Sequence, residues 1–268
     1  MPIAWVTGAS SGLGKHIFEA LQQDGWQVVG GARSFQERQG GAALCLPLDV
    51  TREDSAQRFV QQAMAAFGPP DALVNAAGVL ITGACEDYSD GELKQVLSVN
   101  FLGMARMVRL TLPLMRAKGQ GRIVNLSSIN GLLATPFQGA YTASKHAMEG
   151  YSEALSMEVA PHGIQVMIVE PGDHRGGQDK YRAHAAEAGA DYAKDCAHAR
   201  AAIARDEARG SDPALLGKKV ARAMKKRHMP LRLQVVKLSE RMAVLLHDLL
   251  PGRLFTRFLS AYYGVGRR

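Results

Sequence analysis

The sequence of 268 residues is poor in the residue types that build disulfide frameworks and metal sites. Its three cysteines, Cys45, Cys85 and Cys196, are odd in number and far apart, which matches neither a disulfide framework nor a zinc site. The eight histidines form no HExxH motif and no other close ligand cluster. We therefore expect no metal.

Long apolar runs are also missing from the sequence. No stretch approaches the roughly 20 apolar residues that a membrane-spanning helix needs. The opening residues, MPIAWVTGAS, enter a strand-like run at once, without the charged region, apolar region and cleavage site of a signal peptide. Together with the small number of cysteines, these features predict a protein of the reducing cytoplasm.

Acidic residues become rare toward the end of the chain, where Glu240 and Asp248 are the only acids after Pro213. The formal net charge of the whole chain is +7. Basic segments of this kind can meet nucleic acid, anionic lipid or an acidic partner. The interpretation that we favour is a solvated basic face that also attracts cofactor phosphates, with no nucleic-acid partner.

Hydrophobic residues make up 47% of the chain, enough for a sizeable core in a single domain that spans residues 1–268. Short apolar runs alternate with helix-length segments, which predicts a doubly wound α/β fold with helices on both faces of a parallel sheet of about seven strands. The expected strands are residues 3–8, 26–32, 43–49, 72–78, 121–128 and 164–172. The expected helices are residues 13–24, 52–67, 90–118, 141–160 and 213–227.

The last third of the chain has a different character. Segment 174–209 is rich in alanine and charge and has no strand pattern, so we expect residues 174–230 to form an inserted helical substrate lid. Residues 231–268 mix apolar and basic residues at helical spacing and form an expected C-terminal extension, with a break at Pro251-Gly252. The apolar residues of this tail are either buried in a lid or subunit interface, which we favour, or placed on a membrane surface. They include Leu254, Phe255, Phe258, Tyr262 and Tyr263.

A glycine-rich turn joins the first expected strand to the first expected helix. Glycines let a backbone turn tightly and approach a pyrophosphate, while the helix N-terminus offers free N–H groups. A plain strand-to-helix turn is the alternative, but the position after the first strand favours a dinucleotide site. The predicted binding residues are Thr7, Gly8, Ser10, Ser11, Gly12, Leu13 and Gly14.

With its threonine, this turn resembles the TGxxxGxG motif of the short-chain dehydrogenase/reductase family, and the resemblance continues through about 175 residues. It implies a Rossmann-type fold and a nicotinamide cofactor. It also implies that Asp49 and Val50 receive the adenine and that Pro171-Gly172 lies next to the nicotinamide. Residues 75–78 resemble the family's NNAG motif, which supports the sheet under the cofactor. The predicted residues of that motif are Asn75, Ala76 (in place of the second Asn) and Gly78.

The end of the second expected strand bears on the choice of cofactor. NAD sites usually have an acid there, about 20 residues after the turn. This chain has Ala32, Arg33 and Ser34 instead, and the planar charged fork of Arg33 suits a 2′-phosphate. The Ala-Arg pattern resembles that of NADP(H)-preferring family members, although many of these also have a basic residue where this chain has Ser11. We predict NADP(H) over NAD(H); a surface arginine at the sheet edge is the alternative.

Tyr141 and Lys145 form a YxxxK motif at the start of an expected helix, which places both side chains on one face, about 5–6 Å apart. Reducing a ketone needs a proton donor beside the hydride donor. A free phenol has a pKa of about 10, so it does not readily lose and regain its proton near neutral pH. A nearby ammonium stabilises the phenolate and lowers that pKa. Tyr141 is therefore the predicted general acid for reduction and general base for oxidation. The resemblance adds that Lys145 holds the nicotinamide ribose.

Two further catalytic residues are implied by the family resemblance. Ser128 lies thirteen residues before Tyr141, the spacing of the family's catalytic serine, which hydrogen-bonds the substrate oxygen. Strand alternation points the neighbouring Ser127 the other way. Asn100 matches the family's helix asparagine, which holds a water beside the lysine; without the other motifs, a local helix kink would be the better interpretation.

One position departs from the family pattern. Many members have a threonine four residues after the glycine of Pro171-Gly172, where it binds the nicotinamide carboxamide. This chain has Gly176 there, so the contact falls to the backbone, to another side chain or to nothing. His174 and Arg175 either touch cofactor or substrate or belong to a solvent-facing loop.

These residues predict an NADP(H)-dependent oxidoreductase that moves a hydride between nicotinamide and a carbonyl or secondary alcohol. The composition of the chain favours bulky apolar substrates. One alternative is a non-catalytic NADP(H) sensor, which would need no proton relay. Another is a membrane-peripheral dehydrogenase of lipophilic alcohols. The resemblance also implies a homodimer or homotetramer packed across the helix that carries Tyr141.

Overall fold

The computed structural model describes residues 1–176, 182–184, 189 and 191–266. Its central sheet has eight strands in the order β10-β8-β7-β5-β1-β2-β4-β3. The edge strand β3 (Arg38–Gly40) runs antiparallel to its neighbour. The other seven are parallel, which confirms the predicted doubly wound sheet. They are β1 (Ile3–Thr7), β2 (Gln27–Ala32), β4 (Ala43–Pro47), β5 (Ala72–Asn75), β7 (Gly121–Leu126), β8 (Ile164–Pro171) and β10 (Arg232–Val235).

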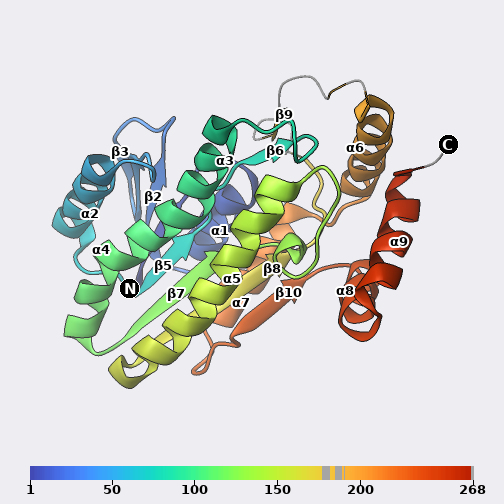
Figure 1. Cartoon of the computed structure of the whole chain (residues 1–268). Helices are drawn as coiled ribbons and strands as arrows, with labels where there is room; N and C mark the ends of the chain where they lie inside the picture. Colours follow the sequence, from blue (N-terminus) through green and yellow to red (C-terminus); the bar gives the residue numbers. More distant parts are fainter. Residues whose placement is uncertain (177–181, 185–188, 190, 267–268) are drawn as a thin grey trace.

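Helices cover both faces of the sheet (Figure 1). On one face, Leu21 and Val220 join a core cluster with the inward side chains of β1 and β2. On the other face, Phe59 and Met107 join a second cluster, in which Phe59 meets Trp5 edge to face at a centroid distance of 6.0 Å. The helices of the first face are α1 (Gly12–Gln23) and α7 (Pro213–Met224), and those of the second are α2 (Glu53–Phe67), α4 (Gly103–Lys118) and α5 (Gly139–Val159).

The order of the strands determines where a ligand can bind. From β1 the sheet continues toward β2 on one side and toward β5 on the other, so the chain connections diverge at this point. In doubly wound sheets the crevice outside the carboxyl ends of such strands binds ligands. The ends of β1, β5 and β7 therefore mark the expected site.

The structure corrects the helix expected at residues 90–118. A π-helical turn, Ser98–Leu102, separates α3 (Asp90–Leu97) from α4. A π turn keeps the chain helical while closing wider i→i+5 hydrogen bonds, so the apolar periodicity of the sequence does not reveal it. After the turn, Gly103 lies so close to the loop after β4 that a Cβ at this residue would be 2.7 Å from Val50 Cγ2.

The segments expected to form the lid and the C-terminal extension also need correction. α7 lies within 174–230 but packs against α1, and β10 lies within 231–268 but pairs with β8. Segment 174–209 contains an unexpected strand, β9 (Arg182–His184), which pairs with β6 (Leu80–Thr82). Strands of three or four residues leave too weak an apolar pattern to be recognised in sequence. Part of the expected lid, at 177–181, 185–188 and 190, lies outside the described residues.

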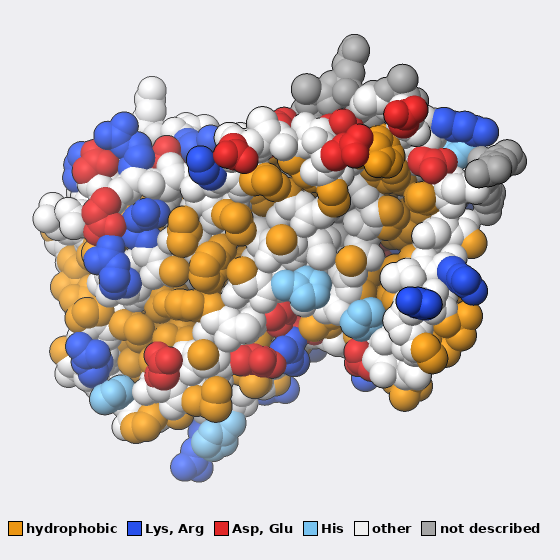
Figure 2. All heavy atoms as spheres, in the orientation of Figure 1, with side chains coloured by type: hydrophobic (Ala, Val, Ile, Leu, Met, Phe, Trp, Pro, Cys, Tyr) orange, Lys and Arg blue, Asp and Glu red, His pale blue; other side chains and the backbone are white. Residues whose placement is uncertain are grey.

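Three further helices, α6 (Ala193–Ala208), α8 (Leu238–Leu249) and α9 (Gly252–Tyr263), lie at one end of the sheet (Figure 1). The break between α8 and α9 falls at Pro251, as predicted. Figure 2 shows hydrophobic and basic side chains side by side over the edge of the molecule that α8 and α9 occupy.

Within the described ranges, no helix has the length and apolar character needed to cross a membrane. The same residues contain no group of three or more His, Cys, Asp or Glu side chains placed to hold a metal ion.

Candidate functional site

A cavity of about 940 Å³ opens at the carboxyl ends of the central strands. It brings together residues that the sequence separates by more than 160 positions, from the glycine turn to the end of β8. Thr7, Ser34, Asn75 and Asn100 are predicted site residues that do not line it. Those that do are Gly8, Ser10, Ser11, Gly12, Leu13, Gly14, Arg33, Asp49, Val50, Ala76, Gly78, Ser128, Tyr141, Lys145, Pro171 and Gly172.

The glycine turn between β1 and α1 forms its part of the wall with backbone. Gly8 and Gly12 have φ angles of +68° and +53°, a region that favours glycine. A Cβ at Gly14 would lie 2.4 Å from the Gly8 carbonyl oxygen, so the turn closes only without a side chain there. Ser11 is the N-cap of α1 but makes no side-chain capping hydrogen bond, which leaves the first helical N–H groups to a ligand.

Thr7 and Asn75 lie beneath the cavity rather than in its wall. Thr7 Oγ1 accepts hydrogen bonds from the N–H groups of Ala76 and Ala77, each at 3.1 Å. Asn75 Nδ2 donates to Asn125 Oδ1 at 2.9 Å. These bonds join the carboxyl ends of β1, β5 and β7, so both residues support the floor of the cavity.

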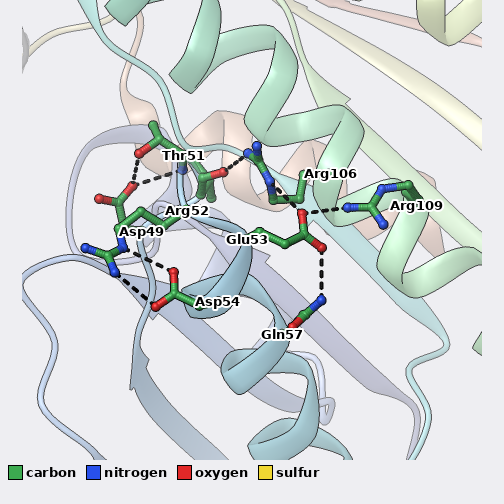
Figure 3. Close-up of polar contacts among 9 residues, drawn as sticks. Asp49, Thr51, Arg52, Glu53, Asp54, Gln57, Arg106 and Arg109 are labelled. Atoms are coloured by element: carbon green, nitrogen blue, oxygen red, sulfur yellow. Dashed lines mark hydrogen bonds and ion pairs between the residues drawn. The ribbon is translucent and has the colours of Figure 1, made fainter.

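Asp49 and Val50 line the cavity in the loop after β4, and Figure 3 shows the polar network that holds this loop. Asp49 Oδ1 accepts from the N–H and the hydroxyl of Thr51 at 2.9 and 2.7 Å. Arg106 of α4 donates to the Val50 carbonyl oxygen and, at 3.1 Å, to Glu53. The loop is thus fixed from two sides, by its own turn and by a helix more than 50 residues away.

Arg33 extends from the end of β2 and is exposed at the rim of the cavity. Ser34 is also exposed but does not reach the cavity wall. Lys15 of α1 also lines the cavity and pairs with Glu19 at 3.5 Å. The cavity lining therefore includes basic side chains from the end of β2 and from α1.

Tyr141 and Lys145 lie one turn apart on α5, as predicted, and both line the cavity. Lys145 Nζ is 5.5 Å from the centroid of the Tyr141 ring. It donates a hydrogen bond of 2.7 Å to the carbonyl oxygen of Leu126, at the end of β7. Burial lowers the pKa of Lys145 to about 8, so the ammonium persists near neutral pH at a cost in desolvation.

An ion cluster with two buried carboxylates begins one turn after Lys145 on α5. Glu149, one turn further along α5, accepts a hydrogen bond of 2.6 Å from Arg232 of β10, and Glu170 of β8 accepts from the same guanidinium nitrogen. Burial raises the pKa of Glu149. The charge of Glu149 in turn opposes the effect of burial on the pKa of Lys145. The cluster fixes the helix of Tyr141 and Lys145 against two strands, and sequence reasoning did not identify it.

Ser128 and Asn100 occupy different positions relative to the cavity. Ser128 lines the cavity, and its Oγ accepts from the N–H of Asn130 at 3.1 Å. Asn100 sits in the π-helical turn with its side chain fully buried. Its amide exchanges two hydrogen bonds with the backbone of Val79, at 2.8 and 2.9 Å, and donates to Ser144 Oγ at 2.9 Å. Asn100 therefore connects α4, α5 and the loop after β5.

The end of β8 is closed by a residue that the sequence did not reveal. A Cβ at Gly172 would lie 2.1 Å from Oε2 of Glu240, so glycine lets α8 approach here. Glu240 Oε1 accepts from the N–H of Asp173 at 2.9 Å. Burial, with Glu240 beside it, raises the pKa of Asp173 to about 7. Asp173 and Glu240 meet across 67 residues of sequence, and no local pattern predicts such a contact.

The loop after Gly172 forms the rim at the position where the family threonine was expected. His174 is buried, and its Nδ1 hydrogen-bonds the Gly172 carbonyl oxygen at 2.8 Å; burial lowers the pKa of His174. Arg175 is exposed but lines the cavity. Gly176 has a φ of +78° and no neighbouring heavy atom within 4 Å of a Cβ position. Both candidate side chains of this loop thus border the cavity.

The strand ends and their turns form what we call the inner wall. The outer wall comes from the loop 173–176 and from α6, α8 and α9. Burial raises the pKa of Tyr263, and the neighbouring Thr135 opposes this rise. The tail residues Phe258, Tyr262 and Tyr263 therefore contribute to the cavity, and Phe255 is buried. Outer-wall residues that the sequence did not assign to the site are Ile203, Asp206, Lys237, Glu240, Ala243 and Leu259.

Comparisons with known proteins agree with this geometry. The family model described as short chain dehydrogenase matches residues 2–184. A 3-ketodihydrosphingosine reductase of Bacteroides thetaiotaomicron is 35% identical over 265 residues, 98% of each chain. A 3-alpha-(or 20-beta)-hydroxysteroid dehydrogenase of Mycobacterium bovis is also 35% identical, over 63% of this chain and 68% of its own.

Solved structures show the same fold. A short-chain dehydrogenase from Streptomyces avermitilis superposes with a TM-score of 0.82 at 31% identity, and the match covers 98% of both chains. An alcohol dehydrogenase from Thermococcus sibiricus, complexed with 5-hydroxy-NADP, gives a TM-score of 0.71 at 22% identity, over 88% of this chain and 96% of its own. The first match extends beyond residue 184 and therefore includes the C-terminal helices.

Proposed function

The chain belongs to the short-chain dehydrogenase family, whose members are NAD(P)(H)-dependent oxidoreductases, and we propose that it interconverts a bulky apolar ketone and its secondary alcohol with NADP(H). The observation that carries this proposal is the convergence of Ser128, Tyr141 and Lys145 in one cavity with the glycine turn. A hydride-transfer site needs this arrangement, because proton transfer and cofactor binding must meet at one carbon atom.

The cavity fits a dinucleotide. The close approach of Gly14 to Gly8 and the uncapped N-terminus of α1 form a cradle that suits a pyrophosphate. We assign Asp49 and Val50 to the adenine end, and Pro171 and Gly172 to the nicotinamide end. When bound, a nicotinamide supplies or accepts the hydride.

The preference for NADP(H) rests on Arg33. It is the side chain at the end of β2, where an NAD site has a carboxylate, and it is exposed and lines the cavity. Titration of the protein with NADPH and with NADH, followed by nucleotide fluorescence, measures the preference. Arg33→Asp should reverse it, and equal affinities in the unaltered protein would contradict the assignment.

We assign the proton to Tyr141, which acts as general acid in reduction and general base in oxidation. Lys145 keeps a positive charge next to the phenol ring, and the carbonyl of Leu126 holds that charge in place. Ser128 hydrogen-bonds the substrate oxygen. Asn100 is a positioning residue, because its amide is occupied by Val79 and Ser144 and fixes the approach of α4 to α5.

Two observations favour a bulky apolar substrate. The outer wall presents Ile203, Phe258, Leu259 and Tyr262 to the part of the cavity beyond the reaction centre. Two relatives are named for a 3-ketodihydrosphingosine and for hydroxysteroids. We therefore propose a keto compound with an extended apolar body, enclosed by the lid region around α6 and by α9.

The test is the oxidation of NADPH, followed by its absorbance, with a panel of ketones that ranges from short and soluble to long-chain and steroidal. The protein should favour the larger ketones. Tyr141→Phe should lower turnover by roughly 10²–10⁴-fold, the usual contribution of a positioned acid, while NADPH still binds. Full turnover by Tyr141→Phe on an accepted ketone would show that the proton has another donor.

A non-catalytic NADP(H) sensor is the competing function. It is disfavoured because the cavity holds Ser128, Tyr141 and Lys145 around one point, and a sensor has no use for a proton donor. Tight NADPH binding with no turnover of any ketone or alcohol in the panel would favour it.

We also propose a homodimer or homotetramer in the cytoplasm. α5 bears Met157, which is 71% exposed, on the helix that carries the reaction centre. Sedimentation velocity of the purified protein measures the assembly, and a monomer at micromolar concentration would rule it out.

A further inference from the structure

The helix α8 has no buried residue among its twelve, all of which are described. One side carries Glu240 and Ala243, which line the cavity. The other side is an apolar stripe with spacings of four, three and four residues, which puts its members on one narrow face of the helix. This stripe consists of Leu238, Met242, Leu245 and Leu249, which are 77%, 44%, 47% and 70% exposed.

The next helix, α9, continues the apolar surface and adds charge. Leu254, Phe258 and Tyr262 follow each other at intervals of four residues and are each about half exposed. Arg253 and Arg257 lie beside them, and α9 contains no acidic residue. Figure 2 shows basic and hydrophobic side chains adjacent on this edge. We call the stripes of α8 and α9, with their arginines, the α8–α9 edge.

We propose that the α8–α9 edge docks on an anionic membrane surface. An exposed apolar stripe flanked by arginine is the pattern of a helix that lies in the headgroup region, where the apolar side chains enter the bilayer and the arginines meet lipid phosphates. A second copy of the chain fits this edge less well. A twofold contact would pair two edges that both carry Arg253 and Arg257 and have no acid on α9 to compensate them, whereas anionic lipid compensates all of these charges.

The cavity opens toward the same edge. Phe258 and Tyr262 line the cavity and are also half exposed, which places them at its mouth. On a docked protein, a carbonyl compound with an alkyl chain passes from the bilayer along α9 to the reaction centre. This route rests on the proposed function, whereas docking itself rests only on the surface.

Co-sedimentation of the full chain with vesicles tests the docking. Phosphatidylglycerol vesicles should bind the protein, and pure phosphatidylcholine vesicles should bind it much less. The double variant Leu245→Glu/Leu249→Glu should weaken binding to phosphatidylglycerol by roughly tenfold or more, since two apolar side chains no longer enter the bilayer. Arg253→Gln/Arg257→Gln should weaken it by roughly fivefold for each arginine.

The control variant is Leu215→Glu, because Leu215 on α7 is 46% exposed, like Leu245, but lies away from the edge. It should bind vesicles as the unaltered protein does. Docking is overturned by equal binding to both vesicle types, by no binding, or by equal loss in all variants. It is also overturned if the variants at 245 and 249 abolish a concentration-dependent self-association instead.

Reduction of a short soluble ketone keeps the two proposals separate. Its rate should be the same in the edge variants and in the unaltered protein, because none of the altered residues lines the cavity. Vesicle binding without turnover of any ketone would refute the proposed function and keep the docking. Turnover of a ketone without vesicle binding would refute the docking and keep the proposed function.

Discussion

The inner wall of the cavity consists of strand ends and tight turns, whereas the outer wall consists of side chains from α6, α8 and α9. In the inner wall, Lys145 is buried and its cation is held by a backbone carbonyl, and Gly14 closes against Gly8. In the outer wall, Phe258 and Tyr262 are half exposed. The cavity thus joins a buried, hydrogen-bonded reaction centre to a half-exposed substrate surface, so the same substitution should have very different effects in the two walls.

The largest effect is expected at the ion cluster behind the inner wall. Arg232→Met leaves Glu149 and Glu170 buried without their cation. We expect the free energy of unfolding to fall by about 3 kcal/mol, the lower end for a broken buried pair, since Arg232 itself is one-third exposed. Urea unfolding measures this. As the control, Lys94→Met breaks an exposed pair with Asp90 and should leave stability unchanged. Equal stabilities of both variants would show that the ion cluster does not hold α5 against the sheet.

Lys145→Met should separate stability from activity in the inner wall. The pKa of Lys145 is lowered from 10.5 to about 8, so below pH 8 the folded protein bears the full cost of a buried ammonium. Replacing it should raise the free energy of unfolding by roughly 3 kcal/mol at pH 7 while abolishing turnover.

The sign of the pH dependence follows from proton uptake. Between pH 8 and 10.5 the unfolded chain holds the Lys145 proton that the folded chain has released, so the unaltered protein gains stability as pH rises. The advantage of Lys145→Met should therefore shrink to nothing near pH 10.5. Turnover of the unaltered protein should decline above pH 8. An advantage that stayed constant with pH would mean that Lys145 is not the group responsible.

A glycine exchange compares a closed turn with an open helix surface. Gly14→Ala puts a Cβ 2.4 Å from a carbonyl oxygen and should cost about 1–3 kcal/mol of stability and weaken NADPH binding. Gly150→Ala, in the middle of α5, meets no heavy atom within 4 Å and should stabilise by about 0.5–1 kcal/mol. Thermal unfolding and nucleotide fluorescence of both variants measure the contrast. Similar shifts in both would show that the turn can relax.

The smallest effect is expected in the outer wall. Tyr263→Phe removes a polar hydroxyl from the cavity lining near Thr135 and should raise KM for a large ketone by about fivefold, with kcat unchanged. Steady-state kinetics measures it. Tyr192→Phe, which removes an exposed bond to Glu86 outside the cavity, should alter neither constant. A fall in kcat for Tyr263→Phe would place the outer wall in the chemistry rather than in binding.

Much of the fold was predictable because strands buried on both faces show near-continuous apolar runs. Six of the seven parallel strands and most of the sheet helices were recognised in this way. β10 was not predicted from the sequence, because only one of its four residues is buried. The π turn was not predicted either, because its residues keep helical periodicity, although Asn100 within it was identified by resemblance. Such elements are stabilised by contacts that lie far away in sequence.

The sequence by itself determined the inner wall, from the glycine turn to the Tyr141–Lys145 pair. Each of these motifs is a short run of neighbouring residues, so it can be recognised without knowing the tertiary contacts. Only the tertiary structure placed Glu240 against Gly172, Arg232 between Glu149 and Glu170, and α9 over the cavity. Each of these contacts joins residues about 60 or more positions apart, so it exists only once the helices have packed. Packing also left the far side of α8 exposed, which no periodicity in the sequence could distinguish from a buried face.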